Sequence, residues 1–211
     1  MRGDWRARVS RPPVFLQVAV AVAALVLAAC TGHPAGTRAH TTPSNSAPVV
    51  RTFAAYSATG SLSVPVAARV TGTCWTNSIT VRAALAYRCL AGNQIMDPCF
   101  APATQTAPTT VACVAAPWDA ATLLTVTGPL PPAPTEHLPP HPWALQLANG
   151  ARCVASTGTA PSVDGVTLNY VCGHDADAGT GRTTRLPVQV SYGAPGGPVL
   201  TTVTVTTIWD G

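Results

Sequence analysis

The stretch CVASTGTAPSVDGVTLNYVC, residues 153–172, decides the fold that the sequence predicts. Turn-forming residues fill its middle, in TGTAPSVDG at 157–165. Three apolar residues then alternate with polar ones: Val166, Leu168 and Tyr170. Alternation with a period of two is typical of a strand with one buried face. The stretch therefore predicts a hairpin that sets Cys153 and Cys172 opposite each other on adjacent strands.

Similar patterns run through the rest of the chain. Further strand candidates are TVACVA, TLLTVTG, WALQLA, ARCVAS and VLTTVTVTTIW. Asn149–Gly150 joins two of them as a hairpin signal. The proline-rich stretch 128–142 predicts an extended loop that divides the domain into two halves. Only Ile79–Ala91 offers a pattern that would support a few helical turns. We therefore expect one mainly β, antiparallel, disulfide-stapled domain, either a small sandwich or a partly open barrel.

The N-terminus has the layout of an export signal. Four arginines and one aspartate precede an apolar run of 16 residues, Val14–Ala29, which is shorter than the roughly 20 that span a bilayer. The run ends in Leu27-Ala28-Ala29-Cys30, which resembles the lipobox of bacterial lipoproteins. The resemblance implies that residues 1–29 are a signal peptide and that Cys30 carries the lipid. It also implies that the mature protein is anchored to the outer face of the cell membrane, since two or three acyl chains anchor durably.

The residues after Cys30 predict a tether followed by one domain. Residues 30–63 are rich in Thr, Ser, Pro, Ala and Gly and lack apolar periodicity, which favours a flexible tether, although its last ten residues could already pack on the domain. Residues 64–211 are long enough for one domain with its own core. Beyond residue 29 the chain has eight basic and seven acidic residues. This nearly neutral balance excludes nucleic-acid binding through a basic face.

Six of the seven cysteines lie in the predicted domain. An even number in an exported chain favours disulfides, because the extracytoplasmic space is oxidising. The sequence alone leaves the pairing open, and the simplest arrangement joins neighbours: Cys74 with Cys89, Cys99 with Cys113, and Cys153 with Cys172. Each loop would contribute about 3 kcal/mol in the chain-entropy model. No Cys/His cluster has zinc spacing, so we expect neither a metal nor a cofactor.

Several segments resemble a group of secreted and lipid-anchored proteins of actinobacteria, including mycobacteria. They are GTCW (72–75), YRCLAGNQIMDPCF (87–100), VACVAAPW (111–118), WALQLANGARC (143–153) and LNYVCG (168–173). Cys and Trp residues occur in the same order across roughly residues 72–209. The resemblance implies location and a disulfide-rich fold, and it carries no catalytic residue to transfer.

The sequence contains no linear catalytic motif. GxSxG, HExxH, P-loop and Rossmann glycine patterns are absent, and the chain has no lysine. The candidate binding residues are Trp75, Asn93, Asp97 and Trp118. Exposed indoles bind partners, although the tryptophans would equally suit a core, and Asp97 before Pro98 equally suits a turn.

Two hypotheses for the function follow. The first is a non-catalytic, lipid-anchored module that binds an envelope protein or a cell-wall glycan. The second is an envelope hydrolase that uses a pair of carboxylates brought together by folding. Two carboxylates converging in a pocket would favour the hydrolase, and an exposed tryptophan surface would favour the binding module.

Overall fold

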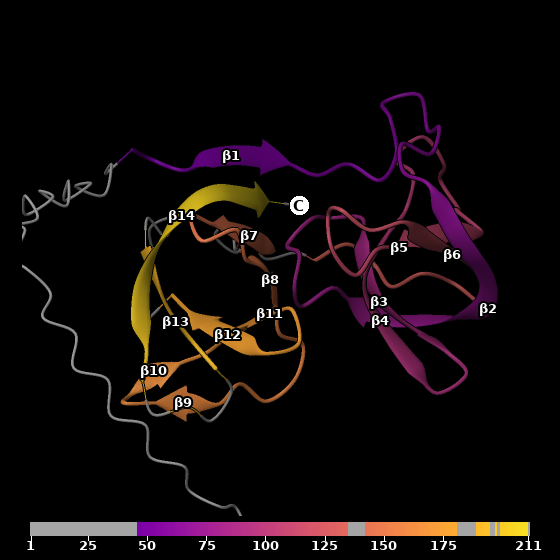
Figure 1. Ribbon diagram of the computed structural model, residues 1–211. Helices are drawn as coiled ribbons and strands as arrows, with labels where there is room; N and C mark the ends of the chain where they lie inside the picture. The colour runs from indigo at the N-terminus through magenta and orange to yellow at the C-terminus, as the bar shows by residue number, and fades with distance from the viewer. Residues whose placement is uncertain (1–45, 135–141, 181–188, 195–196, 198, 211) are drawn as a thin grey trace, which may run out of the picture. The chain divides into compact units, whose positions relative to one another are not determined.

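The computed structural model describes residues 46–134, 142–180, 189–194, 197 and 199–210. These residues form strands and loops without a helix, and they belong to one compact unit, Thr42–Gly211 (Figure 1). The predicted mainly β, disulfide-stapled fold class is confirmed. The predicted signal peptide and Cys30 lie outside the described residues, as does the tether as far as residue 45.

Five strands form a closed barrel. Its strands are β2 (Val66–Asn77), β3 (Ala86–Ala91), β4 (Gln94–Phe100), β5 (Thr110–Cys113) and β6 (Ala121–Val126). Neighbours in sequence pair antiparallel, and β2 closes the barrel by pairing in parallel with β6. An odd number of strands in a simple meander requires one such parallel pair, because the first and last strands run in the same direction.

The other strands form a second sheet. They are β1 (Val49–Thr52), β7 (Ala144–Leu147), β8 (Arg152–Ala155), β11 (Tyr170–Cys172), β12 (Ala176–Gly179), β13 (Gln189–Gly193) and β14 (Thr201–Asp210). The order is β1-β14-β13-β12-β11-β8-β7, and β14 also pairs with β7, so the sheet returns on itself. The small hairpin β9 (Ser162–Val163) and β10 (Val166–Thr167) lies in the connection from β8 to β11.

The three predicted disulfides are confirmed: Cys74–Cys89, Cys99–Cys113 and Cys153–Cys172. Each one links two antiparallel neighbours, β2 to β3, β4 to β5 and β8 to β11. The first two pairs of cysteines face each other directly in the strand register. The hairpin signal at Asn149–Gly150 is also confirmed, since it joins β7 to β8.

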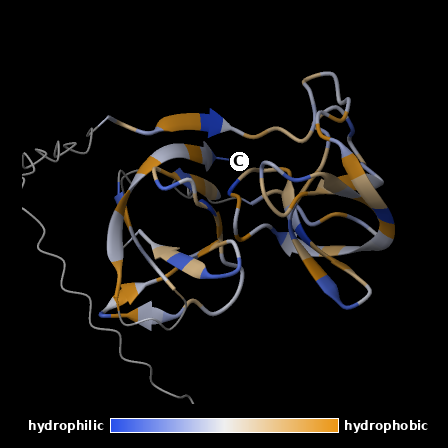
Figure 2. Cartoon of the chain, viewed as in Figure 1, coloured by the Kyte–Doolittle hydropathy of each residue, from blue (hydrophilic) through white to orange (hydrophobic). Residues whose placement is uncertain are grey.

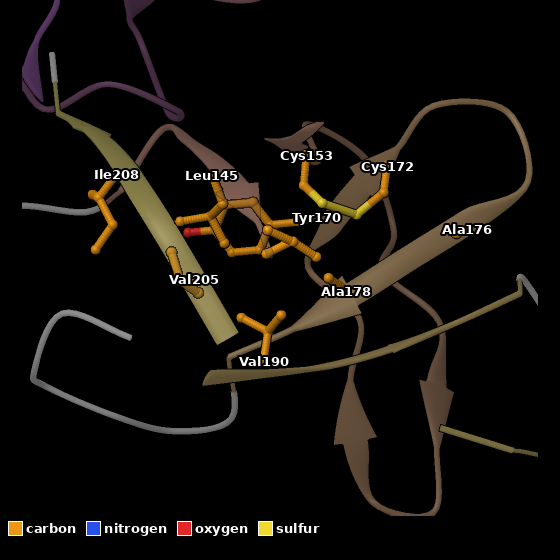
Figure 3. Close-up of a cluster of buried hydrophobic side chains, with 10 residues drawn as sticks. Leu145, Cys153, Tyr170, Cys172, Ala176, Ala178, Val190, Val205 and Ile208 are labelled. Atoms are coloured by element: carbon orange, nitrogen blue, oxygen red, sulfur yellow. A yellow bond between two sulfur atoms is a disulfide. The ribbon is translucent and has the colours of Figure 1, made fainter. Parts of the chain in front are cut away.

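The second sheet encloses a core of ten buried residues (Figure 3). Leu145, Tyr170, Val190, Val205 and Ile208 come from four strands, β7, β11, β13 and β14, and belong to one cluster with the Cys153–Cys172 bridge. The Tyr170 hydroxyl donates a hydrogen bond to the Pro142 carbonyl at 2.7 Å, which satisfies the polar end of this buried ring. The strand alternation in the sequence therefore did indicate the buried face.

Two features differ from the sequence expectation. The last ten residues of the expected tether do pack on the domain, since Ala55 is buried, but the folded part begins still earlier, because β1 pairs in parallel with β14. The composition of this segment is tether-like because all four residues of β1 are exposed, so that only backbone pairing holds the strand. The stretch considered for helical turns, Ile79–Ala91, instead contains β3. Along β3, Tyr87, Cys89 and Ala91 belong to or pack on the buried barrel cluster, whereas Leu90 between them is exposed. This period of two is that of a strand, and tertiary pairing overrides a weak helical preference.

Candidate binding surface

Asp97 is the centre of a polar network at the end of the β2–β3 pair. Its side chain is 1% exposed. Its carboxylate accepts hydrogen bonds from the hydroxyls of Ser78 and Thr80, at 2.9 Å for Thr80, and from the Ile79 N–H at 3.2 Å. Arg88 Nε lies 3.9 Å from Asp97 Oδ2, the oxygen that also accepts from the Ile79 N–H, and forms an ion pair with it. This network fixes the loop after β2, which is a structural use of the carboxylate.

Arg88 connects this network to Trp75. The guanidinium lies 5.8 Å from the centre of the Trp75 ring, which is within the range of a cation–π contact. The Trp75 side chain is 50% exposed and lies at a bulge in the pairing of β2 with β3. The contact with Arg88 restricts the indole, and half of its surface is open to solvent. An exposed aromatic side chain that is already held in place loses little conformational entropy when a partner binds.

Three branched apolar side chains are exposed on β3, on β4 and on the loop that follows β2. Leu90 and Ile95 face each other across β3 and β4, and Ile79 lies beside the Asp97 carboxylate. All three are exposed, Ile79 and Ile95 by 52% each. Figure 2 shows hydrophobic segments next to hydrophilic ones on the β3–β4 hairpin. We call Trp75, Ile79, Leu90 and Ile95 the Trp75 surface.

The remaining predicted residues are placed elsewhere. Asn93 is exposed in the two-residue loop between β3 and β4. Trp118 is half-buried, packs edge-on against Trp209 with ring centres 5.5 Å apart, and has the Arg152 guanidinium 5.3 Å from its ring centre. The structure therefore brings Trp75 and Asp97 together through Arg88 and does not bring Trp118 to them by any described contact.

A pocket of about 190 Å³ adjoins the surface. Its lining is Gln94, Ile95, Met96, Asp97, Cys113, Val114, Ala115, Asp119, Ala120 and Thr122. Two carboxylates thus belong to one pocket. The Asp97 carboxylate is already engaged by three donors and Arg88, so only exposed Asp119 is open to an incoming group. The arrangement lacks the pair of accessible carboxylates that glycoside hydrolysis needs.

Three cysteine sulfurs lie close together inside the barrel. The Sγ atoms of Cys89, Cys99 and Cys113 are within 4.8 Å of one another. All three belong to disulfides, and a disulfide sulfur is not the thiolate that binds a metal. The cluster is therefore part of the barrel core in this oxidised state.

No protein-family model, curated protein or solved structure matches the chain. Among the residues that the structure describes, no helix is long and apolar enough to cross a membrane.

The sequence did not single out five residues of this region. None of them carries a motif, and the strand register and the loop fold place them here: Ile79, Arg88, Leu90, Ile95 and Asp119. Asn93 and Asp97, which the sequence singled out, both belong to the β3–β4 hairpin, which also carries Leu90 and Ile95.

Proposed function

We propose that this protein is a lipid-anchored component of the cell envelope whose domain is a non-catalytic module that binds a protein partner. The observation that carries the binding function is the Trp75 surface on the outside of the barrel. Tryptophan and arginine are enriched at the centres of protein interfaces, and branched apolar neighbours exclude water from such contacts.

The choice of a protein over a glycan follows from the chemistry of this surface. Sugar hydroxyls require free polar groups around a stacking ring, whereas Ile79, Leu90 and Ile95 offer apolar contacts and Asp97 is already bonded. The alternative hydrolase would have to work with Asp119 and without a second accessible carboxylate in that pocket.

The location rests on the sequence of the N-terminus. The basic start, the apolar run and the Leu-Ala-Ala-Cys segment ending at Cys30 support lipidation and export. The three disulfides are consistent with folding in an oxidising compartment.

Cross-linking in intact cells followed by mass spectrometry tests the proposal. The wild type should give a recurrent protein adduct, and Trp75→Ala should reduce its yield at least about tenfold, since hot-spot truncations cost about 2 kcal/mol or more. Val171→Ala, which removes an exposed apolar side chain from β11, should leave the yield unchanged. Cys30→Ser should release the protein from the membrane fraction and remove the adduct. Equal adducts from wild type and Trp75→Ala, or recovery of envelope glycan alone, would overturn the proposal.

A further inference from the structure

We propose that the edge of β4 at Gln94–Asp97 receives an extended peptide segment of the partner, which adds to the barrel as a strand and brings a basic side chain to Asp119. This inference rests on the proposed function, because it names how the partner of the binding module is recognised. Strand addition to a sheet edge is a general mode of peptide recognition.

One side of β4 is paired along only part of its length. β3 pairs with it from Gln94 to Phe100, whereas β5 pairs only at Cys99 and Phe100. Pro98 contributes one more bond, since its carbonyl accepts from the Val114 N–H at 3.0 Å. Among the described residues, no strand lies beside Gln94–Asp97 on that side.

The hairpin turn fixes which backbone groups point to this open side. Gly92 and Asn93 form a two-residue loop, and Gly92 has a φ of 59°, as the first central residue of a type II′ turn requires. The flanking pair Ala91 and Gln94 is then hydrogen-bonded, and the next pair, Leu90 and Ile95, is not. The N–H and C=O of Ile95 therefore point away from β3, toward the open side.

The pocket runs along this same edge. Four consecutive residues of β4 line it, which means that the backbone edge itself forms one wall. The opposite wall comes from residues 113–122, with buried Val114 and exposed Ala115 among them. A strand placed here finds backbone partners on one wall and an apolar recess on the other.

Charge at the rim defines the partner further. Asp119 is exposed, and no described residue forms an ion pair with it, whereas the neighbouring Asp97 forms an ion pair with Arg88. A lysine or arginine in the incoming segment would complement Asp119. Ile95 belongs both to the pocket lining and to the Trp75 surface, so an added strand would extend that surface.

The first experiment selects a phage-displayed library of linear seven-residue peptides on the mature, lipidated protein in detergent micelles. The enriched peptides should alternate apolar and polar residues and carry a basic residue. Their affinities are then measured with fluorescein-labelled synthetic copies by fluorescence anisotropy. Absence of enrichment, or enriched peptides without a basic residue, would overturn the inference.

Variants separate backbone addition from side-chain contact. Ile95→Pro removes the outward N–H and should weaken binding at least tenfold, whereas Ile95→Ala, which keeps the N–H, should weaken it less. Asp119→Asn should weaken binding several-fold, and Asn93→Ala, at the hairpin tip, should leave it unchanged. N-methylation of alternate backbone amides in the peptide tests the same bond without changing the protein and should also cost at least tenfold.

The outcomes distinguish this inference from the proposed function. Binding that persists unchanged in Ile95→Pro and in N-methylated peptides overturns strand addition. If Trp75→Ala still loses the cellular adduct in that case, the binding module stands and its partner contacts the Trp75 surface in another way.

Discussion

At the scale of single residues, Asp97 shows how a polar residue in a candidate segment serves the fold. Replacing Asp97 by Asn keeps its size but removes the charge that attracts Arg88 and turns one acceptor into a donor that faces donors. We expect Asp97→Asn to lower the free energy of unfolding by about 1–3 kcal/mol. Urea unfolding measures this change. Exposed Asp119→Asn is the matched control and should change stability by less than about 0.5 kcal/mol.

The buried phenol of Tyr170 leads us to expect that stability falls with pH in the alkaline range. Burial raises the pKa of Tyr170 well above 10.0, and the negative charge of Asp210 raises it further. In the unfolded chain the phenol ionises near pH 10, while the folded protein keeps the proton. The contribution of Tyr170 to the free energy of unfolding is therefore constant below that pH and falls above it. Tyr170→Phe should therefore flatten the decline measured by urea unfolding between about pH 10 and 11.5.

The same substitution has an opposite effect at neutral pH. Tyr170→Phe leaves the Pro142 carbonyl without this donor and should cost about 1 kcal/mol at pH 7. Part of the alkaline decline should persist in the variant, because burial also raises the pKa of Tyr56 and Tyr87. Equal slopes for wild type and variant would show that the Tyr170 proton does not distinguish the folded from the unfolded state.

At the scale of elements, the barrel depends on close approach of β2 to β3 at Gly72. A Cβ at this position would lie 2.1 Å from the Leu90 carbonyl oxygen, which is backbone and has no flexible end to move away. Gly72→Ala should therefore force β2 and β3 apart and lower the melting temperature by several degrees, as a loss of about 2 kcal/mol does in a domain of this size. Gly158→Ala meets no atom within 4 Å and is the control.

The sequence predicted those elements whose partners lie close by along the chain. The turn residues between Cys153 and Cys172 and the Asn149–Gly150 signal specify hairpins locally, and the first of these hairpins favours pairing of Cys153 with Cys172. The parallel pairs β2–β6 and β1–β14 join segments far apart in sequence, and no short-range pattern encodes them. For the same reason the sequence indicated the hairpin that carries Asp97 but not Arg88 or Asp119 as its neighbours.

At the scale of the molecule, Trp143 unites three parts of the chain that are distant in sequence. Its side chain is fully buried in a cluster with residues of the N-terminal segment and of the barrel. The ring packs edge-on against Phe53, with centres 5.0 Å apart, and lies 5.9 Å from the Phe100 ring. The Trp143 N–H also donates to the Trp209 carbonyl at 2.8 Å, so both backbone and ring hold this position.

Truncation of this residue should therefore affect the folded unit as a whole. Trp143→Ala removes a buried indole at which residues of the N-terminal segment and the barrel meet, and it should lower the free energy of unfolding by about 3–5 kcal/mol. Trp118→Ala removes the same side chain from a half-buried site and should lower the free energy of unfolding clearly less.

Hydrogen exchange of the Phe53 N–H, which donates to the Asp210 carbonyl at 2.8 Å, adds a local readout. Faster exchange there in Trp143→Ala than in Trp118→Ala at equal distance from the melting temperature would show that Trp143 fastens the N-terminal segment. Equal exchange would mean that the pairing of β1 with β14 holds that segment by itself.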